Sequence, residues 1–399
     1  MKGAAWTPRS RASRLERIVS IRHLRWLSVD WHVLALAAGL LLTGLVFIRA
    51  MDDADFRFDR ETVDFWGHVR KVVVALPALF LGLFLRPRWL RRNAWLLYAA
   101  SIVLLLFVPF IGVERNNARR WIPLPGLGFD LQPSELAKLG LILMLASVLY
   151  RRRLLRLDEW VRPVTLCIVP MGLVVLQPDL GTAMTIVPIA LGMLYLAGAR
   201  TLLVAIGLCL VAFVAAKEVG ILHDYQTQRI RTWMDSFAAE RLIEDKTGPA
   251  FHTYHARVAI GNGGLFGTGL GRGVANEAAH LPERDCDSIF AVIAEETGFG
   301  GASALLVAYA LLVALLLNSA SHIRERFSRL TVGGIALYFA SHFFVNVGVN
   351  LGLVPMTGLT LPLLSTGGSS LLVTFLALGL ALGLSAHQEP TLDQDAFRS

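Results

Sequence analysis

The chain has 399 residues, of which 55% are hydrophobic and 17% are charged. This balance excludes an ordinary soluble domain, because several unbroken apolar runs reach the roughly 17–25 residues that a helix needs to cross a bilayer. The formal net charge of +8 would suggest a nucleic-acid partner in a soluble protein. Here most basic residues lie in short segments between apolar runs, which indicates membrane orientation, and no nucleic-acid partner is expected.

The N-terminal segment 1–30 is basic, and the first apolar run begins near Trp31. No small-residue cleavage site follows a short apolar core, so the segment is expected to remain as a cytoplasmic anchor. Leu15, Ile18 and Val19 have helical spacing beside the arginines. An interfacial helix on the inner leaflet and a disordered basic tail both fit this pattern.

Ten apolar segments predict an all-α integral membrane domain of ten transmembrane helices over residues 31–386. The expected spans are 31–50, 69–85, 94–112, 133–150, 163–177, 179–198, 201–217, 288–317, 330–353 and 369–386. Long unbroken runs indicate helices and not barrel strands, because only closed hydrogen-bonding structures survive in lipid. The span that begins at residue 288 is longer than a bilayer requires, so we expect it to tilt, kink or project from the membrane.

Charge in the connecting loops orients these helices. Arginine-rich loops stay in the cytoplasm, which places 86–92, 151–162 and 324–329 there, together with both termini and the tail 387–399. The segments expected outside are 51–68, 113–132, 218–287 and 354–368. The large extracytoplasmic loop 218–287 is the only long one, and its aromatics, glycines and mixed charges favour a functional role.

Polar motifs gather at the outer ends of the expected helices. They are "NNARRWIPLPGLGFDLQPSELAKL" (116–139), "QPDLGTA" (177–183), "GNGGLFGTGLGRG" (261–273), "LPERDCD" (281–287) and "PMTGLTLPLLSTGGSS" (355–370). Their convergence predicts an outward-facing site for a substrate held in the outer leaflet.

The first of these motifs carries two neighbouring arginines and a candidate ion pair. Arg119 and Arg120 stay protonated and offer forked donors, which suit a phosphate or pyrophosphate and equally suit lipid head groups. Glu135 and Lys138 can pair on one helix face, either as part of a site or as a self-neutralising pair without a ligand. Pro133 in the first turn indicates a helix start, with Glu135 near the positive end of the helix dipole.

Other polar features are weaker signals. Asp179 follows a proline at a helix start, where an N-cap is the simplest role. The glycine-rich segment 261–273 offers backbone N–H groups that suit a phosphate, but it lacks the context of a dinucleotide fingerprint. His252 and His255 do not supply metal-ligand spacing, so no metal site is predicted. No disulfide is predicted from Cys167, Cys209 and Cys286.

Five carboxylates follow one another in "LPERDCDSIFAVIAEETGFGG" (281–301). Glu283 follows a proline and is expected in solvent. Asp287 stands where the apolar run begins, as an N-cap or as a working acid, and Asp285 so close by would raise its pKa. Glu295 and Glu296 lie eight or nine residues past Asp287 and would be about 12–14 Å deep if this stretch is helical. Acids at that depth are functional candidates, although pairing with a buried cation would also explain them.

The ordered motifs "RRWI…QPSELAK", "QPDLGTA", "GNGGLFGTGLGRG", "LPERDCDSIFAVIAEETG" and "VPMTGLTLPLLSTGGSS" resemble the SEDS family, the RodA/FtsW/SpoVE proteins, over nearly the whole chain outside its termini. "LPER" and "IFAVIAEE" resemble the RodA branch more than the FtsW branch. The resemblance implies a ten-helix peptidoglycan glycosyltransferase of the bacterial cytoplasmic membrane. Such proteins polymerise lipid II with a class B penicillin-binding protein as partner, here for cell elongation and shape, with division left open.

The family's essential acid stands in a Thr-Asp pair before the "IFAVI" helix, and the matching pair here is Cys286-Asp287. The family pattern His-Thr-Asp-Phe is Asp285, Cys286, Asp287 and Ser288 in this chain. Other departures are His255-Ala256, where the family has Gln-Ser, and "PLLSTGGSS" from residue 362, where it has "PFISYGGSS". The resemblance therefore assigns the catalytic role to Asp287 in a changed setting.

The reaction implied is attack of a sugar 4-hydroxyl on C1 of a lipid-linked sugar, with undecaprenyl pyrophosphate leaving. Asp287 would be the general base, and cations or a divalent ion (Mg²⁺ or Mn²⁺) would stabilise the leaving group. One displacement inverts the configuration without a covalent intermediate. The expected substrate-binding residues are Arg119, Arg120, Glu135, Lys138, Asp179, Glu283, Asp285, Ser365 and Ser369.

Two other classes of function fit part of the sequence. A flippase or transporter of lipid-linked precursors typically has internal repeats and a site at the membrane midplane, and no repeat stands out here. A non-catalytic scaffold of the wall-synthesis machinery would need no acid. Membrane lipids would contact the chain in every case.

Overall fold

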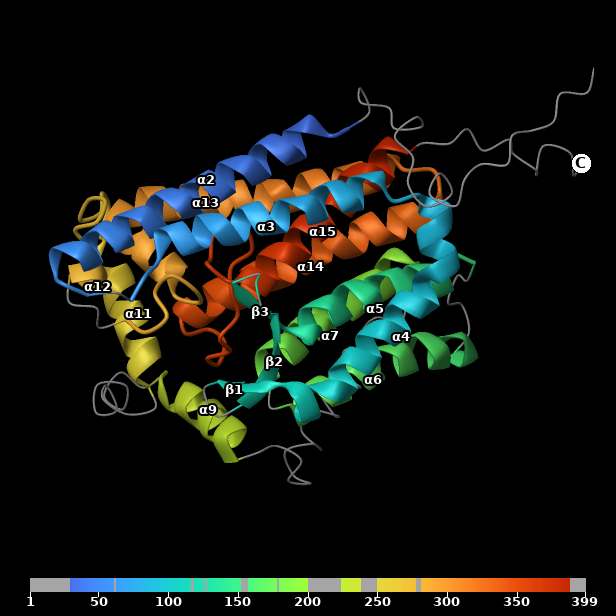
Figure 1. The fold of residues 1–399 in the computed structure, drawn as a ribbon, viewed down its shortest axis with the longest axis horizontal. Coiled ribbons are helices and arrows are strands. Elements are labelled where there is room, and N and C mark those ends of the chain that lie inside the picture. Colours follow the sequence, from blue (N-terminus) through green and yellow to red (C-terminus); the bar gives the residue numbers. More distant parts are fainter. Residues whose placement is uncertain are drawn as a thin grey trace, which may run out of the picture.

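The computed structural model describes residues 29–60, 62–115, 118–124, 126, 128–151, 157–177, 179–199, 224–237, 250–277 and 281–387. They form a bundle of long helices that run side by side (Figure 1). The helices are α2 (Trp31–Arg57), α3 (Phe65–Phe84), α4 (Pro87–Ile111), α5 (Pro133–Leu149), η2 (Leu157–Trp160), α6 (Val161–Leu176), α7 (Leu180–Leu196), α9 (Asp224–Asp235), α11 (Phe251–Asn262), α12 (Val274–Glu277), α13 (Ile289–His322), α14 (Arg326–Asn350) and α15 (Gly368–Ala386).

The helical membrane fold expected from the sequence is confirmed. Nine of the ten expected spans coincide with helices of the structure, and the tenth, 201–217, lies outside the described residues. Within the described residues, six helices are long and apolar enough to cross a membrane, namely α2, α3, α4, α13, α14 and α15. Residues 1–28 and 388–399 lie outside the described residues, and so does the interfacial helix considered there.

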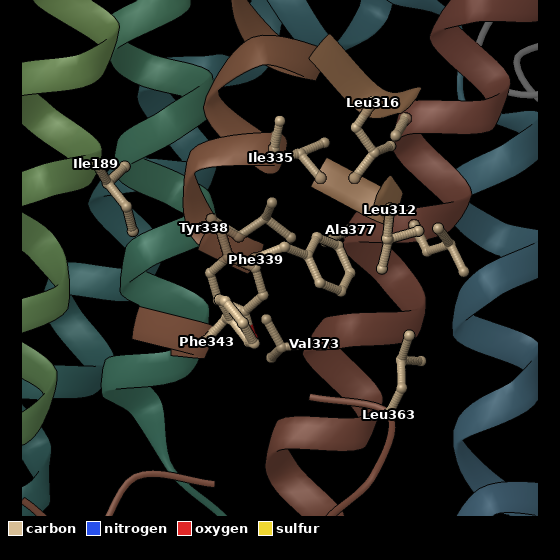
Figure 2. Close-up of a cluster of buried hydrophobic side chains, with 14 of the residues drawn as sticks. Ile189, Leu312, Leu316, Ile335, Tyr338, Phe339, Phe343, Leu363, Val373 and Ala377 are labelled. Carbon is tan, nitrogen blue, oxygen red and sulfur yellow. The ribbon is translucent and has the colours of Figure 1, made fainter. Parts of the chain in front are cut away.

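Helices α14 and α15 form the core of the bundle. Of their most apolar stretches 83% and 89% are buried, against 22–39% for the other four long helices, which present apolar faces outward. Figure 2 shows side chains of α7, α13, α14 and α15 meeting there, and Tyr309 stacks on Phe343 with ring centroids 4.7 Å apart. Helix α15 also packs closely on α3: a Cβ at Gly379 would come within 2.0 Å of the Leu79 carbonyl oxygen.

The overlong span is broken, which confirms the kink allowed by its length. Within α13, Gly298 has φ 67° and ψ −166°, so a short helix before it meets a long helix after it at an angle. This backbone region is essentially restricted to glycine. The glycine-rich segment 261–273 wraps the break, where the Phe299 N–H donates to the Gly264 carbonyl at 2.8 Å.

A small antiparallel sheet follows α4, and an all-α expectation did not include it. Its strands are β1 (Val113–Arg115), β2 (Ala118–Leu124) and β3 (Phe129–Leu131), in the order β1-β2-β3. Trp121 opposes Val113, and Ile122 opposes Leu131. Val113 and Ile122 are β-branched and Trp121 is aromatic, and such residues favour strands. The sheet holds the two arginines of β2 beside the entry to α5.

The two ends of the bundle differ in character. One end gathers the sheet, α9, α11, α12 and the turn between α14 and α15, and the opposite end holds the start of α2 and the end of α15 (Figure 1). All five polar motifs meet at the first end, as the sequence predicts. The long loop 218–287 contains the helices α9, α11 and α12 in its described part. We call the end with the sheet and the polar motifs the motif end. We call the opposite end, at the start of α2 and the end of α15, the arginine end.

Candidate functional site

The turn 281–288, which leads into α13, carries the candidate acid and is fixed by a buried cation. Arg284 is 3% exposed and pairs with Asp55 at the end of α2. The Arg284 guanidinium also donates to the Thr62 hydroxyl at 2.9 Å and to the Asn276 carbonyl at 3.0 Å. No local sequence pattern indicates this role for Arg284 or Asp55. Together they bind the turn to the first spanning helix.

Asp287 is buried, with 6% of its surface exposed. Its carbonyl accepts hydrogen bonds from the side-chain amides of Asn346 and Asn350 on α14, both at 2.9 Å. The N-cap of α13 is Ser288, and in the described part of the chain no backbone N–H of α13 donates to the Asp287 carboxylate. The N-cap alternative for Asp287 therefore does not hold. Among the described residues, its carboxylate accepts no hydrogen bond from the backbone of α13, although the backbone of Asp287 is held in place.

His252 on α11 faces this carboxylate. Its Nε2 lies 2.8 Å from the Ser288 hydroxyl and 3.5 Å from Oδ1 of Asp287. The Ser288 hydroxyl also donates to the Pro282 carbonyl at 3.2 Å. Because that hydroxyl has one proton, Nε2 of His252 is then the protonated nitrogen of the ring and donates toward Ser288 and Asp287. Among the described residues Nδ1 of His252 is buried and has no partner.

The other acids of the turn differ from Asp287 in their surroundings. Asp285 accepts from the Thr366 hydroxyl at 2.6 Å. Glu283 is exposed, as expected. Partial burial and the charges of Asp287 and Asp285 raise the pKa of Glu283 above its usual value.

Cys286 has a thiol that stays protonated. Burial and the neighbouring Asp285 carboxylate raise the pKa of Cys286 well above its usual value. Its sulfur lies 3.0 Å from the Thr366 hydroxyl. The ligand atoms of Glu283, Asp285 and Cys286 lie within 4.8 Å of one another. The two carboxylates are ligands that suit Mg²⁺ or Mn²⁺, and the soft thiol is not.

The predicted serines hold the backbone of the site together. The Ser365 hydroxyl accepts from the Leu361 N–H at 2.8 Å and donates to the Cys286 carbonyl. The Ser369 hydroxyl accepts from the Gln132 N–H at 2.9 Å. The turn between α14 and α15, together with the first turn of α15, thereby joins the acid cluster to the start of α5.

Asp179 is the N-cap of α7, which confirms the simplest interpretation of its position. Its carboxylate accepts from the Thr182 N–H at 3.2 Å and from the Gln132 side-chain amide at 2.9 Å. Arg120 lies 3.7 Å from Asp179, and 18% of its side chain is exposed. The side chain of Arg119 is 56% exposed and lies 3.5 Å from Glu114. Arg119 is therefore the more accessible of the two cations.

Glu135 and Lys138 form a buried pair, 2.7 Å apart, inside the bundle. The Lys138 ammonium also donates to Nε2 of His342 at 2.6 Å, so the ring proton lies on Nδ1, which faces the Thr360 carbonyl at 3.3 Å. Tyr338 donates to the other Glu135 oxygen at 3.3 Å. These contacts match the second interpretation of Glu135 and Lys138, a pair that neutralises itself without a ligand. They link the pair to the motif end through the backbone of Thr360.

Glu295 and Glu296 lie on the short helical stretch of α13 that ends at Gly298, and buried contacts inside the protein engage both. Glu295 accepts from the backbone N–H groups of Val274 and Ala275 at 3.1 and 2.9 Å and so caps α12. Glu296 accepts from the Asn276 amide at 2.5 Å. In the glycine-rich segment the N–H groups of residues 268 and 269 donate to the carbonyls of these two acids. Those N–H groups serve the helix break and not a phosphate.

Comparisons with known proteins are consistent with this arrangement. The family model for FtsW, RodA and SpoVE, described as "Cell cycle protein", matches residues 30–390. The chain is 36% identical over 364 residues to a probable peptidoglycan glycosyltransferase FtsW of Aromatoleum aromaticum, covering 87% of this chain and 85% of the relative. It is 34% identical over 323 residues to peptidoglycan glycosyltransferase MrdB of Escherichia coli K12, covering 80% and 85%.

Solved structures give the same result. A chain of a peptidoglycan synthase complex that coordinates polymerization and crosslinking superposes with a TM-score of 0.76 at 32% identity, covering 90% of this chain and 98% of the other. Rod shape determining protein RodA of Thermus thermophilus superposes with a TM-score of 0.66 at 33% identity, covering 92% and 99%. Relatives of both branches match at similar identity, so the closer likeness to RodA stays a prediction. This chain belongs to the FtsW/RodA/SpoVE family.

Proposed function

We propose that this chain, a peptidoglycan glycosyltransferase of the FtsW/RodA/SpoVE family, polymerises lipid II at the motif end of its bundle with Asp287 as the general base. The main support is the buried Asp287 carboxylate, which caps no helix and whose backbone is held by two asparagines of α14. It would accept the proton of the acceptor sugar's 4-hydroxyl as that oxygen attacks C1 of the donor. Undecaprenyl pyrophosphate then leaves in the same step, with inversion.

His252 and Ser288 are proposed as positioning residues for this base. The His252 ring donates toward both Ser288 and Asp287. The contact of His252 with Ser288 fixes the orientation of the ring beside the carboxylate. The two residues would therefore keep the Asp287 carboxylate aimed at the hydroxyl.

The predicted binding residues divide into direct and supporting roles. Exposed Arg119, and Arg120 beside it, are proposed to face the pyrophosphate, since forked donors match its oxygens. Glu283 and Asp285 would border the acceptor sugar near Asp287. The remaining residues are engaged inside the protein and are proposed to shape the site: Glu135, Lys138, Asp179, Ser365 and Ser369. A divalent cation on the pyrophosphate would be carried by the substrate.

We further propose that the motif end faces outward from the bacterial cytoplasmic membrane. The cytoplasmic parts would be the segment 1–30, the arginine end of the domain 31–386 and the tail 387–399. Single cysteines at Arg272 and Arg324 test this with an impermeant maleimide in a Cys286→Ser background. Labelling of Arg272→Cys in intact cells, and of Arg324→Cys only after permeabilisation, is the expected result. The reverse pattern would overturn the orientation.

A class B penicillin-binding protein is proposed as the partner. The support is that a similar chain forms part of a solved peptidoglycan synthase complex. Purification of the chain in mild detergent from its native host should enrich such a protein, and repeated absence of one would remove this proposal. Both FtsW and MrdB relatives match, so the proposed role in elongation rests on the RodA-like segments.

The proposed activity is tested with the purified chain and fluorescent lipid II in liposomes, with and without the partner. Glycan polymer is the expected product. Translocated monomer without polymer would favour a flippase, and neither product in the presence of the partner would favour a scaffold. The same assay serves for all variants below.

A further inference from the structure

A cavity of about 470 Å³ lies at the arginine end, far from the acid cluster along the bundle, between α4, α5 and the start of α6. Its chemistry is set by four arginines and two aromatic residues in its lining: Arg91, Arg92, Arg151, Arg162, Trp95 and Tyr150. The proposed polymerase reaction uses none of them. The cavity is therefore separate from the site of the proposed reaction.

The arginines of the cavity are only partly neutralised. Arg91 pairs with Glu325 at 3.1 Å. The guanidinium groups of Arg91 and Arg151 lie over the Tyr150 ring, 5.1 and 5.0 Å from its centroid, on segments that α4 and α5 bring together. In the part of the chain that the structure describes, no carboxylate pairs with Arg92, Arg151 or Arg162. Among the described residues, the four arginines of the lining thus have one carboxylate partner, Glu325.

We propose that this cavity binds the headgroup phosphate of an anionic phospholipid from the leaflet at the arginine end. Clustered like charges repel one another unless an anion lies among them, and forked guanidinium donors match phosphate oxygens. Basic pockets between spanning helices on the cytoplasmic side are a recurring kind of lipid site. The ligand class is a phosphodiester with a net negative charge.

A lipid fits this cavity better than free phosphate because apolar surface adjoins it. Trp95, in the lining, is 61% exposed, and aromatic rings of this kind lie at membrane interfaces. Apolar side chains on the two helices beside the cavity are also exposed: Leu96 of α4 by 49% and Ile168 of α6 by 54%. A headgroup among the arginines would leave its acyl chains along these outward faces of α4 and α6.

The test is native mass spectrometry of the full chain in mild detergent, titrated with phosphatidylglycerol, phosphatidylcholine or inorganic phosphate. Phosphatidylglycerol is expected to stay bound, phosphatidylcholine to dissociate, and phosphate at equal concentration not to displace the anionic lipid. Equal retention of the two lipids would overturn the proposal. Displacement by phosphate would assign the cavity to a free anion.

A matched pair of variants places the site. Arg92→Gln with Arg162→Gln removes two cations from the cavity, and Arg324→Gln with Arg329→Gln removes two exposed cations at the same end outside it. One arginine near an anionic headgroup contributes about fivefold in affinity. The cavity variant should therefore bind phosphatidylglycerol on the order of 25-fold more weakly, and the control should bind nearly as the parent does. Equal losses in both would show general charge attraction and refute a site in the cavity.

Discussion

The side-chain amide of Asn346 donates to the backbone carbonyl of Asp287 at 2.9 Å, across 59 residues of sequence. The same amide donates to the Leu359 carbonyl at 2.7 Å. One residue of the central helix α14 thus holds both the turn of the candidate base and the turn between α14 and α15. The position of Asp287 is set by the core of the bundle and not by its own helix.

Replacing Asn346 tests this positioning. Asn346→Ala leaves two buried carbonyls with fewer donors, and an unsatisfied buried acceptor costs about 1–3 kcal/mol. A small displacement of a catalytic group lowers turnover by up to about 10²-fold, so kcat should fall more than affinity for lipid II. Asn93→Ala, whose amide donates to the Trp89 carbonyl within α4, is the control with expected normal turnover. Equal turnover of both variants would show that α14 does not position the base.

The buried pair of Arg284 and Asp55 makes a prediction about stability. Removing one partner of a buried ion pair leaves an uncompensated charge and costs about 3–5 kcal/mol. Arg284→Met should therefore lower the melting temperature strongly in detergent. Arg284→Met combined with Asp55→Leu should recover much of the loss, and strictly additive losses would exclude coupling between the two residues.

The helix break at Gly298 makes a prediction with a control inside the same helix. A Cβ at Gly298 would lie 2.3 Å from the Gly267 nitrogen, and a Cβ at Gly300 would meet no neighbour closer than 3.8 Å. Gly298→Ala should cost about 1–3 kcal/mol from backbone strain alone, and more from the clash. Gly300→Ala should be neutral or stabilising by up to about 1 kcal/mol. Thermal unfolding of both variants checks this, and equal stability would mean that α13 is continuous.

The raised pKa of Glu283 predicts a pH effect. Partial burial and then the Asp287 carboxylate raise that pKa, and coupling between two carboxylates is reciprocal. Glu283→Gln removes a like charge, which favours the ionised form of the remaining acids. The acidic limb of the pH–rate profile should therefore move to lower pH, on the order of one unit or less.

The control for this shift is Glu277→Gln, which removes an exposed carboxylate of α12 outside the acid cluster. Its acidic limb should stay where the parent has it. A limb that moves to higher pH in Glu283→Gln would contradict the sign of the coupling.

Local features of this fold could be predicted from the sequence. The spans follow from apolar runs, and the contact of Glu135 with Lys138 follows from their spacing on a helix. Asp179 as a cap and the start of α5 at Pro133 follow from the residue types at those positions. Each depends only on residues a turn or so apart.

The rest depends on contacts between distant residues. His252 reaches Ser288 across 36 residues and Arg284 reaches the Thr62 hydroxyl across 222, so no local pattern indicates them. The apolar run through Gly298 gives no sign of a break, because a glycine in a helix is tolerated. The break separates Glu295 and Glu296 from the long stretch of α13 that follows Gly298.

The central claim is tested most directly by Asp287→Asn and Asp285→Asn at matched expression in the lipid II polymerisation assay. Both substitutions are nearly isosteric, and an asparagine at 285 can still accept the bond from Thr366. Loss of a general base costs typically about 10²–10⁴-fold in rate, so Asp287→Asn should form no detectable polymer while remaining folded in the membrane. Asp285→Asn should keep clear activity. Polymer formation by Asp287→Asn at the parent rate would contradict the account and leave the site without its base.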